Sequence, residues 1–267
     1  MQSLTDIRNL LEVRGLKPLK QFGQNFLHDQ NQIRRLVEAA GIEPGDRVLE
    51  IGPGTGALTE ALLEAGAEVI ACEIDTGLAD LVADRFGDQV QLVRGDCLGQ
   101  GRRLSPDVEK VLGDAPWSLV ANLPYQAASP VMIELLMHQP GCRGQFVTIQ
   151  KEVADRLLAS PGEKARGPLG ILASTFGTIE RIGVIPPSCF WPQPKVVSAM
   201  VALRPLELEQ EIDRQAYARF GTMLFSSRRK QLGRILGRDR RLPEGIEPSW
   251  RPEVLTNEQL IALFRLD

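Results

Sequence analysis

Short apolar runs alternate with stretches of helical spacing along the first part of the chain. Runs bounded by glycine predict buried strands, and apolar residues three or four positions apart predict helices that pack on them. The strands are expected at 46–52, 67–75, 90–96, 118–124 and 144–150, and the helices at 31–42, 56–66, 77–87 and 130–138. This alternation predicts an α/β fold with a parallel, doubly wound sheet.

Both ends of the chain depart from this alternation. The first 17 residues predict an amphipathic helix, whereas residues 185–203 hold four prolines followed by an alternating apolar run at 197–203. The prolines predict a rigid loop and the run predicts one more strand. Helical spacing dominates from Arg204 onward. We therefore expect two domains, residues 1–203 with the sheet and residues 204–267 as a small helical domain.

Composition excludes several classes of protein. No apolar stretch reaches the roughly 18 residues that a membrane span requires. The only histidines are His28 and His138, and the four cysteines form no C-x-x-C pair, so a metal site or a Ser-His-Asp triad is hard to build. Without a signal peptide the cysteines are expected to be free thiols in a reducing cytoplasm. The net charge of −3 argues weakly against a nucleic-acid partner.

A glycine-rich loop joins the first predicted strand to its helix. Gly52, Gly54 and Gly56 allow a tight turn and a close backbone approach to a ligand, and the helix that follows offers free N–H groups. Gly52, Gly54 and Ala57 also satisfy the dinucleotide fingerprint. An NAD site and a glycine turn without a ligand are both open interpretations of this loop.

Acidic residues at the ends of neighbouring strands narrow the choice of ligand. Glu73, about 20 residues beyond the loop, can accept hydrogen bonds from both hydroxyls of a ribose. Asp96 ends the next strand and can accept from an adenine amino group. Glu50, directly before the loop, is more typical of methyltransferases than of dehydrogenases. These acids favour S-adenosyl-L-methionine over NAD.

The sequence Ala-Asn-Leu-Pro-Tyr at 121–125 ends the fourth strand at the same edge of the sheet. The side-chain oxygen of Asn122 and the carbonyl of Leu123 are two acceptors, Pro124 has no N–H, and Tyr125 offers a ring on which a base can stack. Two acceptors orient an exocyclic amine, whose lone pair is otherwise delocalised into its ring. This stretch predicts methylation of an amino group by in-line displacement. The alternative is a strand-ending turn with a packed tyrosine.

The chain resembles the bacterial small-subunit (16S) rRNA adenine N6,N6-dimethyltransferases, and the resemblance runs nearly end to end. It rests on eight stretches in family order: FGQNFLHD (22–29), VLEIGPGTGALT (48–59), CEID (72–75), GD (95–96), ANLPY (121–125), QKEVADRL (150–157), PPSCFWPQPKVVSA (186–199) and LFSSRRKQL (224–232). The resemblance implies a Rossmann-like methyltransferase sheet. It also implies dimethylation of two adjacent adenosines near the 3′ end of the small-subunit rRNA.

The resemblance also implies roles for individual residues. Asn25 and Leu27, in the arm before the sheet, would contact the cofactor together with Gly52, Glu73 and Asp96. Asn122 would meet both the cofactor and the target amine. Tyr125 and Phe190 would hold the flipped adenine between their rings.

Two stretches depart from the family pattern. The segment QAASP follows Tyr125 where the family has a different polar and small-residue pattern. The segment ARGPLG has Arg166 where the family has tyrosine, with Pro168 added. Both departures concern the loop near the target, and neither affects the expected reaction.

Basic residues cluster at 228–241, and four of them are expected to bind RNA: Arg228, Arg229, Lys230 and Arg234. A second basic group consists of Lys17, Lys20, Arg34 and Arg35, and the alternative for either group is a solvated face. The partner implied is small-subunit rRNA or a partly assembled small ribosomal subunit, with the enzyme as a monomer. Two other functions stay open, a large-subunit rRNA methylase and a ribosome-assembly factor without catalysis.

Overall fold

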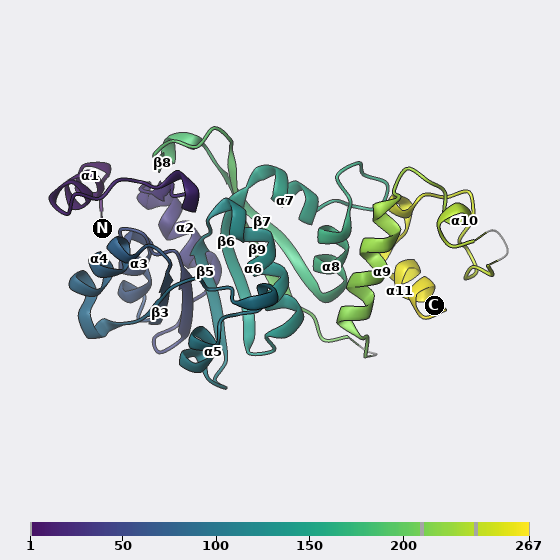
Figure 1. Cartoon of the computed structure of the whole chain (residues 1–267), viewed down its shortest axis with the longest axis horizontal. Helices are drawn as coiled ribbons and strands as arrows, with labels where there is room; N and C mark the ends of the chain where they lie inside the picture. Colours follow the sequence, from purple (N-terminus) through teal and green to yellow (C-terminus); the bar gives the residue numbers. More distant parts are fainter. Residues whose placement is uncertain (1, 209–210, 238–239, 267) are drawn as a thin grey trace. The chain divides into compact units, whose positions relative to one another are not determined.

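The computed structural model describes residues 2–208, 211–237 and 240–266. The chain divides into two compact units, Met1–Ala154 with Glu180–Pro205, and Asp155–Ile179 with Leu206–Asp267. Figure 1 shows the course of the chain through both of them. No helix in the described ranges combines the length and the apolar character that crossing a membrane requires.

The first unit is built on a seven-stranded sheet with the order β4-β3-β2-β5-β6-β9-β7. The strands are β2 (Arg47–Ile51), β3 (Glu68–Glu73), β4 (Val90–Arg94), β5 (Trp117–Asn122), β6 (Cys142–Gln150), β7 (Gly177–Ile185) and β9 (Ser198–Pro205). Strands β2 to β6 pair in parallel, and all five expected strand positions are confirmed.

The predicted parallel sheet is extended by strands beyond β6, and β9 is not parallel to it. The run predicted at 197–203 forms β9, but it pairs antiparallel to β6, with Thr148 opposite Met200. Beyond it lies β7, which was not predicted from the sequence, because its apolar residues are interrupted by glycine and charged residues and most of its positions are not buried. The sheet is therefore mixed, as is common when an edge strand is added to a parallel sheet.

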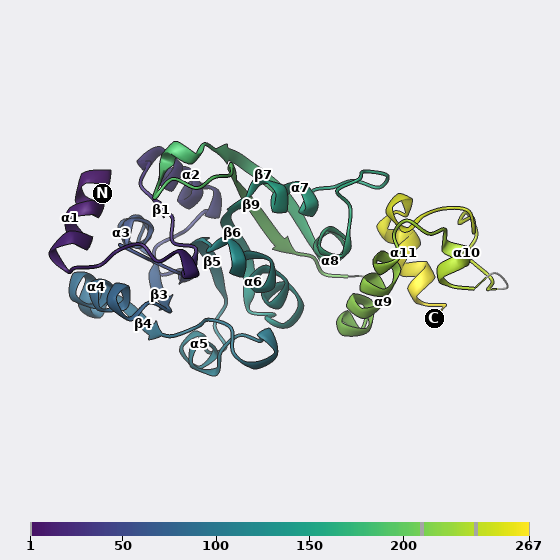
Figure 2. The same cartoon turned by 45° about the horizontal axis from the view of Figure 1, so that its top comes forward.

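Helices α2 (Gln30–Ala40), α3 (Ala57–Glu64) and α4 (Thr76–Phe86) form one apolar cluster with strands of the sheet. Their ends follow from local chemistry. Asp29 and Asp75 cap α2 and α4 by accepting from backbone N–H groups of the first turns. Gly41 ends α2 in the left-handed region, at φ 61°. Figure 2 shows these helices from a second direction.

Helix α6 (Tyr125–His138) starts earlier than the sequence predicts. The expected start was Pro130, because proline favours the first turn. Pro130 instead lies inside the helix, and the segment QAASP forms its first turns. Proline at this position removes the bond to the carbonyl of Gln126, four residues earlier, and its ring crowds that carbonyl. Gln126 is exposed to water.

The remaining elements of the first unit are an N-terminal helix and short connecting pieces. They are α1 (Leu4–Val13), β1 (Phe26–Leu27), α5 (Pro106–Leu112), β8 (Phe190–Trp191) and several 3-10 turns. Helix α7 (Lys151–Leu157) spans the division between the units. Strands β1 and β8 pair antiparallel and tie the arm before the sheet to the proline-rich loop. The expected amphipathic helix at the start of the chain is confirmed.

The second unit contains α8 (Pro168–Phe176), α9 (Arg214–Ser226), α10 (Leu232–Ile235) and α11 (Asn257–Phe264). Its core is aromatic. Tyr217 is 1% exposed and meets Phe176 and Phe264 edge-on, with centroid distances of 5.5 and 5.3 Å.

The division near residue 204 lies close to the one expected, but the second unit is larger than 204–267. Residues 155–179 pack with it. The reason is visible at Arg166, which is 2% exposed and donates to the carbonyl oxygens of Ala159 and Leu255 and to Asn257 Oδ1. Arg166 thus fastens the 155–179 segment to the C-terminal helices, and the departure noted in the sequence has a structural role there.

Candidate active site

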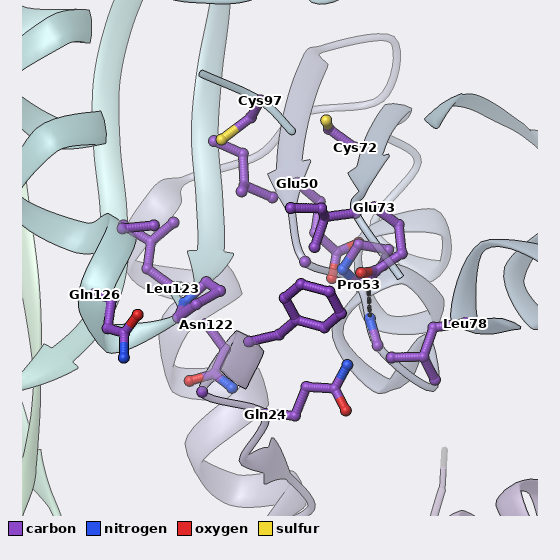
Figure 3. A pocket seen from close by; sticks show the side chains of 18 of the residues that line it. Gln24, Glu50, Pro53, Cys72, Glu73, Leu78, Cys97, Asn122, Leu123 and Gln126 are labelled. Atoms are coloured by element: carbon purple, nitrogen blue, oxygen red, sulfur yellow. Dashed lines mark hydrogen bonds between the residues drawn. The ribbon is translucent and has the colours of Figure 1, made fainter. Parts of the chain in front are cut away.

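A cavity of about 410 Å³ opens at the carboxyl ends of β2, β3 and β5 and is closed by the arm before the sheet (Figure 3). Its size is within the range of small-molecule sites. Ten of the expected site residues line it: Asn25, Leu27, Gly52, Gly54, Glu73, Asp96, Asn122, Leu123, Pro124 and Tyr125. The structure thus brings together segments that are almost 100 residues apart in the chain.

The glycine loop has the backbone geometry that its sequence requires. Gly52, Gly54 and Gly56 have φ values of 71°, 60° and 83°, in the region that side chains disfavour. A Cβ at Gly54 would lie 2.8 Å from the Phe26 ring. Any residue larger than glycine would therefore push the arm away from the loop.

Glu73 ties the glycine loop to the end of β3. It is 4% exposed, and its carboxylate accepts from Gly54 N at 3.2 Å and from Asp75 N at 2.9 Å. Burial raises the pKa of Glu73 above its ordinary value. Each carboxylate oxygen retains a lone pair for a ligand hydroxyl. Asp96 is exposed at the cavity, and its Oδ1 accepts from Leu98 N at 2.9 Å.

Glu50 lines the same cavity and was not selected as a binding residue from the sequence. It is 1% exposed, and Thr59 Oγ1 donates to its Oε2 at 2.6 Å. Burial raises its pKa to about 8, with a smaller contribution from the nearby charge of Glu73. Glu50 is therefore mostly protonated at pH 7. In the sequence, the position of Glu50 directly before the glycine loop was the feature that could have indicated it as a cavity residue.

The arm reaches Asn122 through one hydrogen bond. Asn122 Nδ2 donates to the carbonyl oxygen of Asn25 at 2.9 Å. This bond assigns the NH₂ end of the amide to the arm and leaves Oδ1 as the acceptor available to a ligand. Gln24, also in the arm, donates to Asp75 Oδ2 at 3.0 Å. The arm is therefore fastened to Asn122 at the end of β5 and to Asp75 at the start of α4.

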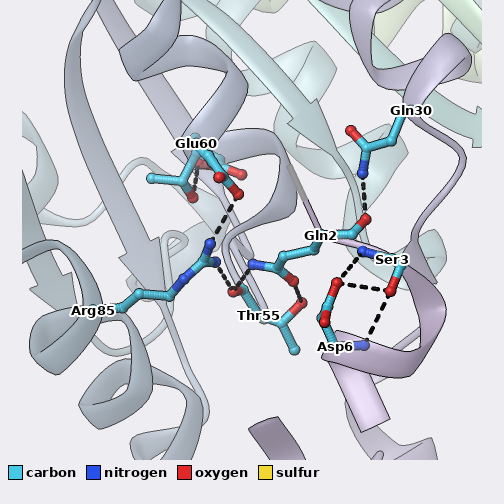
Figure 4. A network of polar contacts seen from close by, with 9 residues as sticks. Gln2, Ser3, Asp6, Gln30, Thr55, Glu60 and Arg85 are labelled. Atoms are coloured by element: carbon cyan, nitrogen blue, oxygen red, sulfur yellow. Dashed lines mark hydrogen bonds and ion pairs between the residues drawn. The ribbon is translucent and has the colours of Figure 1, made fainter. Parts of the chain in front are cut away.

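A second attachment between the N-terminus and the glycine loop was missed in the sequence. Gln2 is 4% exposed and Thr55 is 1% exposed. Gln2 Nε2 donates to Thr55 O at 2.7 Å, and Thr55 Oγ1 donates to Gln2 Oε1 at 2.9 Å (Figure 4). Arg85 Nη1 also donates to Thr55 O, at 2.7 Å. Nothing in the linear sequence connects residues 2 and 55, so no pattern could have indicated the pair.

Tyr125 is half-buried at the start of α6. Its hydroxyl is 2.7 Å from Ser198 Oγ, and burial raises its pKa. The hydrogen bond fixes the ring at the cavity, next to Asn122. The side of the ring that lines the cavity is thus available for stacking.

Phe190 does not join Tyr125 at the cavity. It is 2% exposed and belongs to the apolar cluster beneath α2 and α3, and it is not among the residues that line the cavity. In this structure Phe190 pairs with Leu27 in β1–β8 and packs in the apolar cluster, and its role against the target base stays a prediction. The neighbouring Trp191 stacks on Phe26, with a centroid distance of 6.3 Å.

The residues expected to bind RNA lie in the second unit. Arg229, Lys230 and Arg234 are exposed, whereas Arg228 is half-buried and its Nη2 donates to Lys164 O at 2.9 Å. Arg238 and Asp239 of the same basic stretch lie outside the described residues. In the second basic group, Arg35 donates to the carbonyl oxygen of Ile182.

The cavity fits S-adenosyl-L-methionine on the chemistry of its residues. The glycine loop has no side chains and leaves room for the cofactor to approach the backbone. The buried carboxylate of Glu73 suits the hydroxyls of a ribose. The amide oxygen of Asn122 is an acceptor for an amine. Gly52, Gly54, Glu73 and Asp96 would hold the cofactor, with the arm residues Asn25 and Leu27 over it. Among the described residues there is no group of three or more His, Cys, Asp or Glu side chains that could hold a metal ion.

Comparison with known proteins gives a consistent result. The sequence model of the ribosomal RNA adenine dimethylases matches residues 15–257. The ribosomal RNA small subunit methyltransferase A of Rhodococcus opacus is 41% identical, and that of Nocardia farcinica 40%; each alignment covers 97% of this chain and 92% of the relative.

Solved structures agree with the sequence relatives. A dimethyladenosine transferase from Plasmodium falciparum is 26% identical with a TM-score of 0.74, over 89% of this chain and 95% of that one. The 23S rRNA methyltransferase ErmE is 25% identical with a TM-score of 0.70, over 91% and 99%. The fold is therefore that of a Rossmann-like methyltransferase, and the chain belongs to the ribosomal RNA adenine dimethylase family.

Proposed function

We propose that this protein transfers methyl groups from S-adenosyl-L-methionine to N6 of adenines in small-subunit ribosomal RNA. The observation that carries the proposal is the orientation of Asn122, which lines the cavity and whose NH₂ donates to Asn25 O, so that Oδ1 is left as the acceptor. The family and the small-subunit enzymes at 40–41% identity support the substrate class.

The residues of the chain act by orienting the amine. Asn122 Oδ1 and the Leu123 carbonyl accept the two N6 hydrogens, which favours a pyramidal nitrogen with a localised lone pair. The cofactor supplies the electrophilic methyl carbon. Transfer of that methyl group to N6 would leave the cofactor as a neutral thioether, and the proton that N6 gives up would pass to water. Tyr125, held by Ser198, stacks on the base.

The detailed target is two adjacent adenosines near the 3′ end of the 16S rRNA, each of which receives two methyl groups. The higher identity to small-subunit enzymes than to the 23S rRNA methyltransferase supports this choice. The enzyme would act as a monomer in the cytoplasm, where small subunits are assembled.

The exposed cations of the second unit are the proposed contact to RNA. Arg229 and Lys230 are exposed, whereas Arg228 is half-buried and donates to Lys164 O. Reversing the charges of Arg229 and Lys230 is expected to weaken binding of small-subunit RNA in a filter assay and to leave cofactor binding unchanged. Unchanged RNA binding at physiological salt would remove this surface from the proposal.

The function is tested with tritium-labelled S-adenosyl-L-methionine and purified ribosomal subunits from a strain that lacks the dimethylation. Label on small but not large subunits is expected, with loss of transfer in Asn122→Ala. Label on large subunits alone would show that the protein is a large-subunit rRNA methylase instead. No label on either, with cofactor still bound, would favour an assembly factor without catalysis.

A further inference from the structure

Arg102 is the only cation among the described residues that line the cavity. The same lining contains three acidic side chains, Glu50, Glu73 and Asp96. Within the described part of the chain no ion pair or hydrogen bond of the Arg102 side chain is present, whereas the neighbouring Arg103 is paired. An unpaired guanidinium at the edge of an acidic cavity is a ready site for an anion.

The backbone holds Arg102 in place. Arg102 has φ 61°, and it is the only residue other than glycine with a positive φ in the described chain. The loop that carries it is closed by a bridge between Leu98 and Leu104 and by a bond from Gly99 N to Arg103 O at 2.7 Å. Arg102 therefore belongs to a small closed loop after β4, where it is exposed and lines the cavity.

Helix α6 fixes this loop beside the target residues. Glu134 is 5% exposed, and its Oε1 accepts from Leu104 N at 3.2 Å and pairs with Arg103 Nε at 3.0 Å. The same helix begins at Tyr125, and its first turns line the cavity. A buried carboxylate thus fastens the loop of Arg102 to the element that presents the target site.

We propose that Arg102 binds an RNA phosphate next to the target adenosine. This rests on the proposed function of the cavity. A base that leaves its stack brings its own phosphates to the cavity, where the carboxylates would repel them. A guanidinium provides the opposite charge and two parallel donors for phosphate oxygens. The carboxylate of the cofactor is a less suitable partner, because Arg102 follows Asp96, which is assigned to the adenine end.

Three variants test the proposal. Arg102→Asn removes the charge and tolerates the left-handed backbone, and Arg102→Lys retains the charge. Arg143→Asn is the matched control. Arg143 is an exposed arginine at the amino end of β6, whereas the cavity lies at the carboxyl ends of the parallel strands. The readouts are KM for small subunits at several salt concentrations, and Kd for S-adenosyl-L-methionine measured by equilibrium binding without RNA.

For Arg102→Asn we expect KM to rise about tenfold and the slope of log KM against log salt to fall by about 0.7. Cofactor Kd is expected to stay unchanged, which also shows that the variant is folded. Arg102→Lys should retain the salt slope and raise KM less, and Arg143→Asn should behave as the wild type.

Two results would overturn the proposal. An unchanged KM and salt slope in Arg102→Asn would show that no phosphate is bound there. A raised Kd for the cofactor with an unchanged KM for RNA would assign the cation to the cofactor carboxylate. Failure of the proposed function is separate, since the wild-type enzyme would then transfer no methyl group to small subunits in the same assay.

Discussion

The buried Glu50 makes a specific prediction about stability and pH. Its pKa in the folded protein is about 8, against an ordinary value of 4.5, because burial penalises the charged form. Between these values the unfolded chain has lost the proton while the folded protein retains it. The unfolded state then binds fewer protons, so the free energy of unfolding falls as the pH rises.

The magnitude follows from this difference in pKa. Each pH unit between 4.5 and 8 lowers the free energy of unfolding by about 1.4 kcal/mol. At pH 7 the accumulated loss is about 3 kcal/mol relative to a side chain that is always neutral. Glu50→Gln provides such a side chain, and its amide oxygen can accept the hydrogen bond from Thr59.

The assay is urea unfolding of the cofactor-free protein at several pH values between 5 and 8. We expect wild type and Glu50→Gln to have similar stability at pH 5 and to diverge progressively, with the variant more stable at pH 7. Glu64→Gln, at an exposed position at the end of α3, is the control and should follow the wild type. Parallel curves for wild type and Glu50→Gln would refute the reasoning.

Three further variants address other contacts. Gln2→Ala removes the bonds to Thr55, and we expect cofactor binding measured by calorimetry to weaken about fivefold. Asn9→Ala, on the exposed face of α1, is the control and should leave cofactor binding unchanged. Arg166→Leu leaves buried acceptors unpaired and should destabilise the second unit by about 3 kcal/mol in denaturant unfolding; an unchanged midpoint would contradict its structural role. Tyr125→Phe retains the ring and loses the hydroxyl bond, so kcat should fall severalfold, less than in Asn122→Ala; an equal loss would contradict the stacking role.

The sequence predicted what depends on local pattern. Apolar periodicity identified the five parallel strands, and residue chemistry at the strand ends selected Glu73, Asp96 and Asn122, which the fold brings to one cavity. Carboxyl ends of parallel strands meet at one edge, so strand position was sufficient to gather these side chains.

What the sequence did not predict depends on pairing between distant segments. The pairing of Gln2 with Thr55, the burial of Phe190 opposite Leu27 and the attachment of Arg166 to the C-terminal helices are tertiary contacts without a periodic signal. Phe190 is instructive, because an aromatic residue in a proline-rich loop has the same sequence appearance whether it packs inward or faces a ligand. Only the β1–β8 register decides between the two.

The central claim is that this cavity dimethylates adenines of small-subunit rRNA. The most direct test is to incubate the enzyme and S-adenosyl-L-methionine with undermethylated small subunits, digest the RNA to nucleosides, and identify and map the products by mass spectrometry. We expect N6,N6-dimethyladenosine at two adjacent positions near the 3′ end, and none with Asn122→Ala. Methylation at other positions, or equal product with the Asn122 variant, would contradict it.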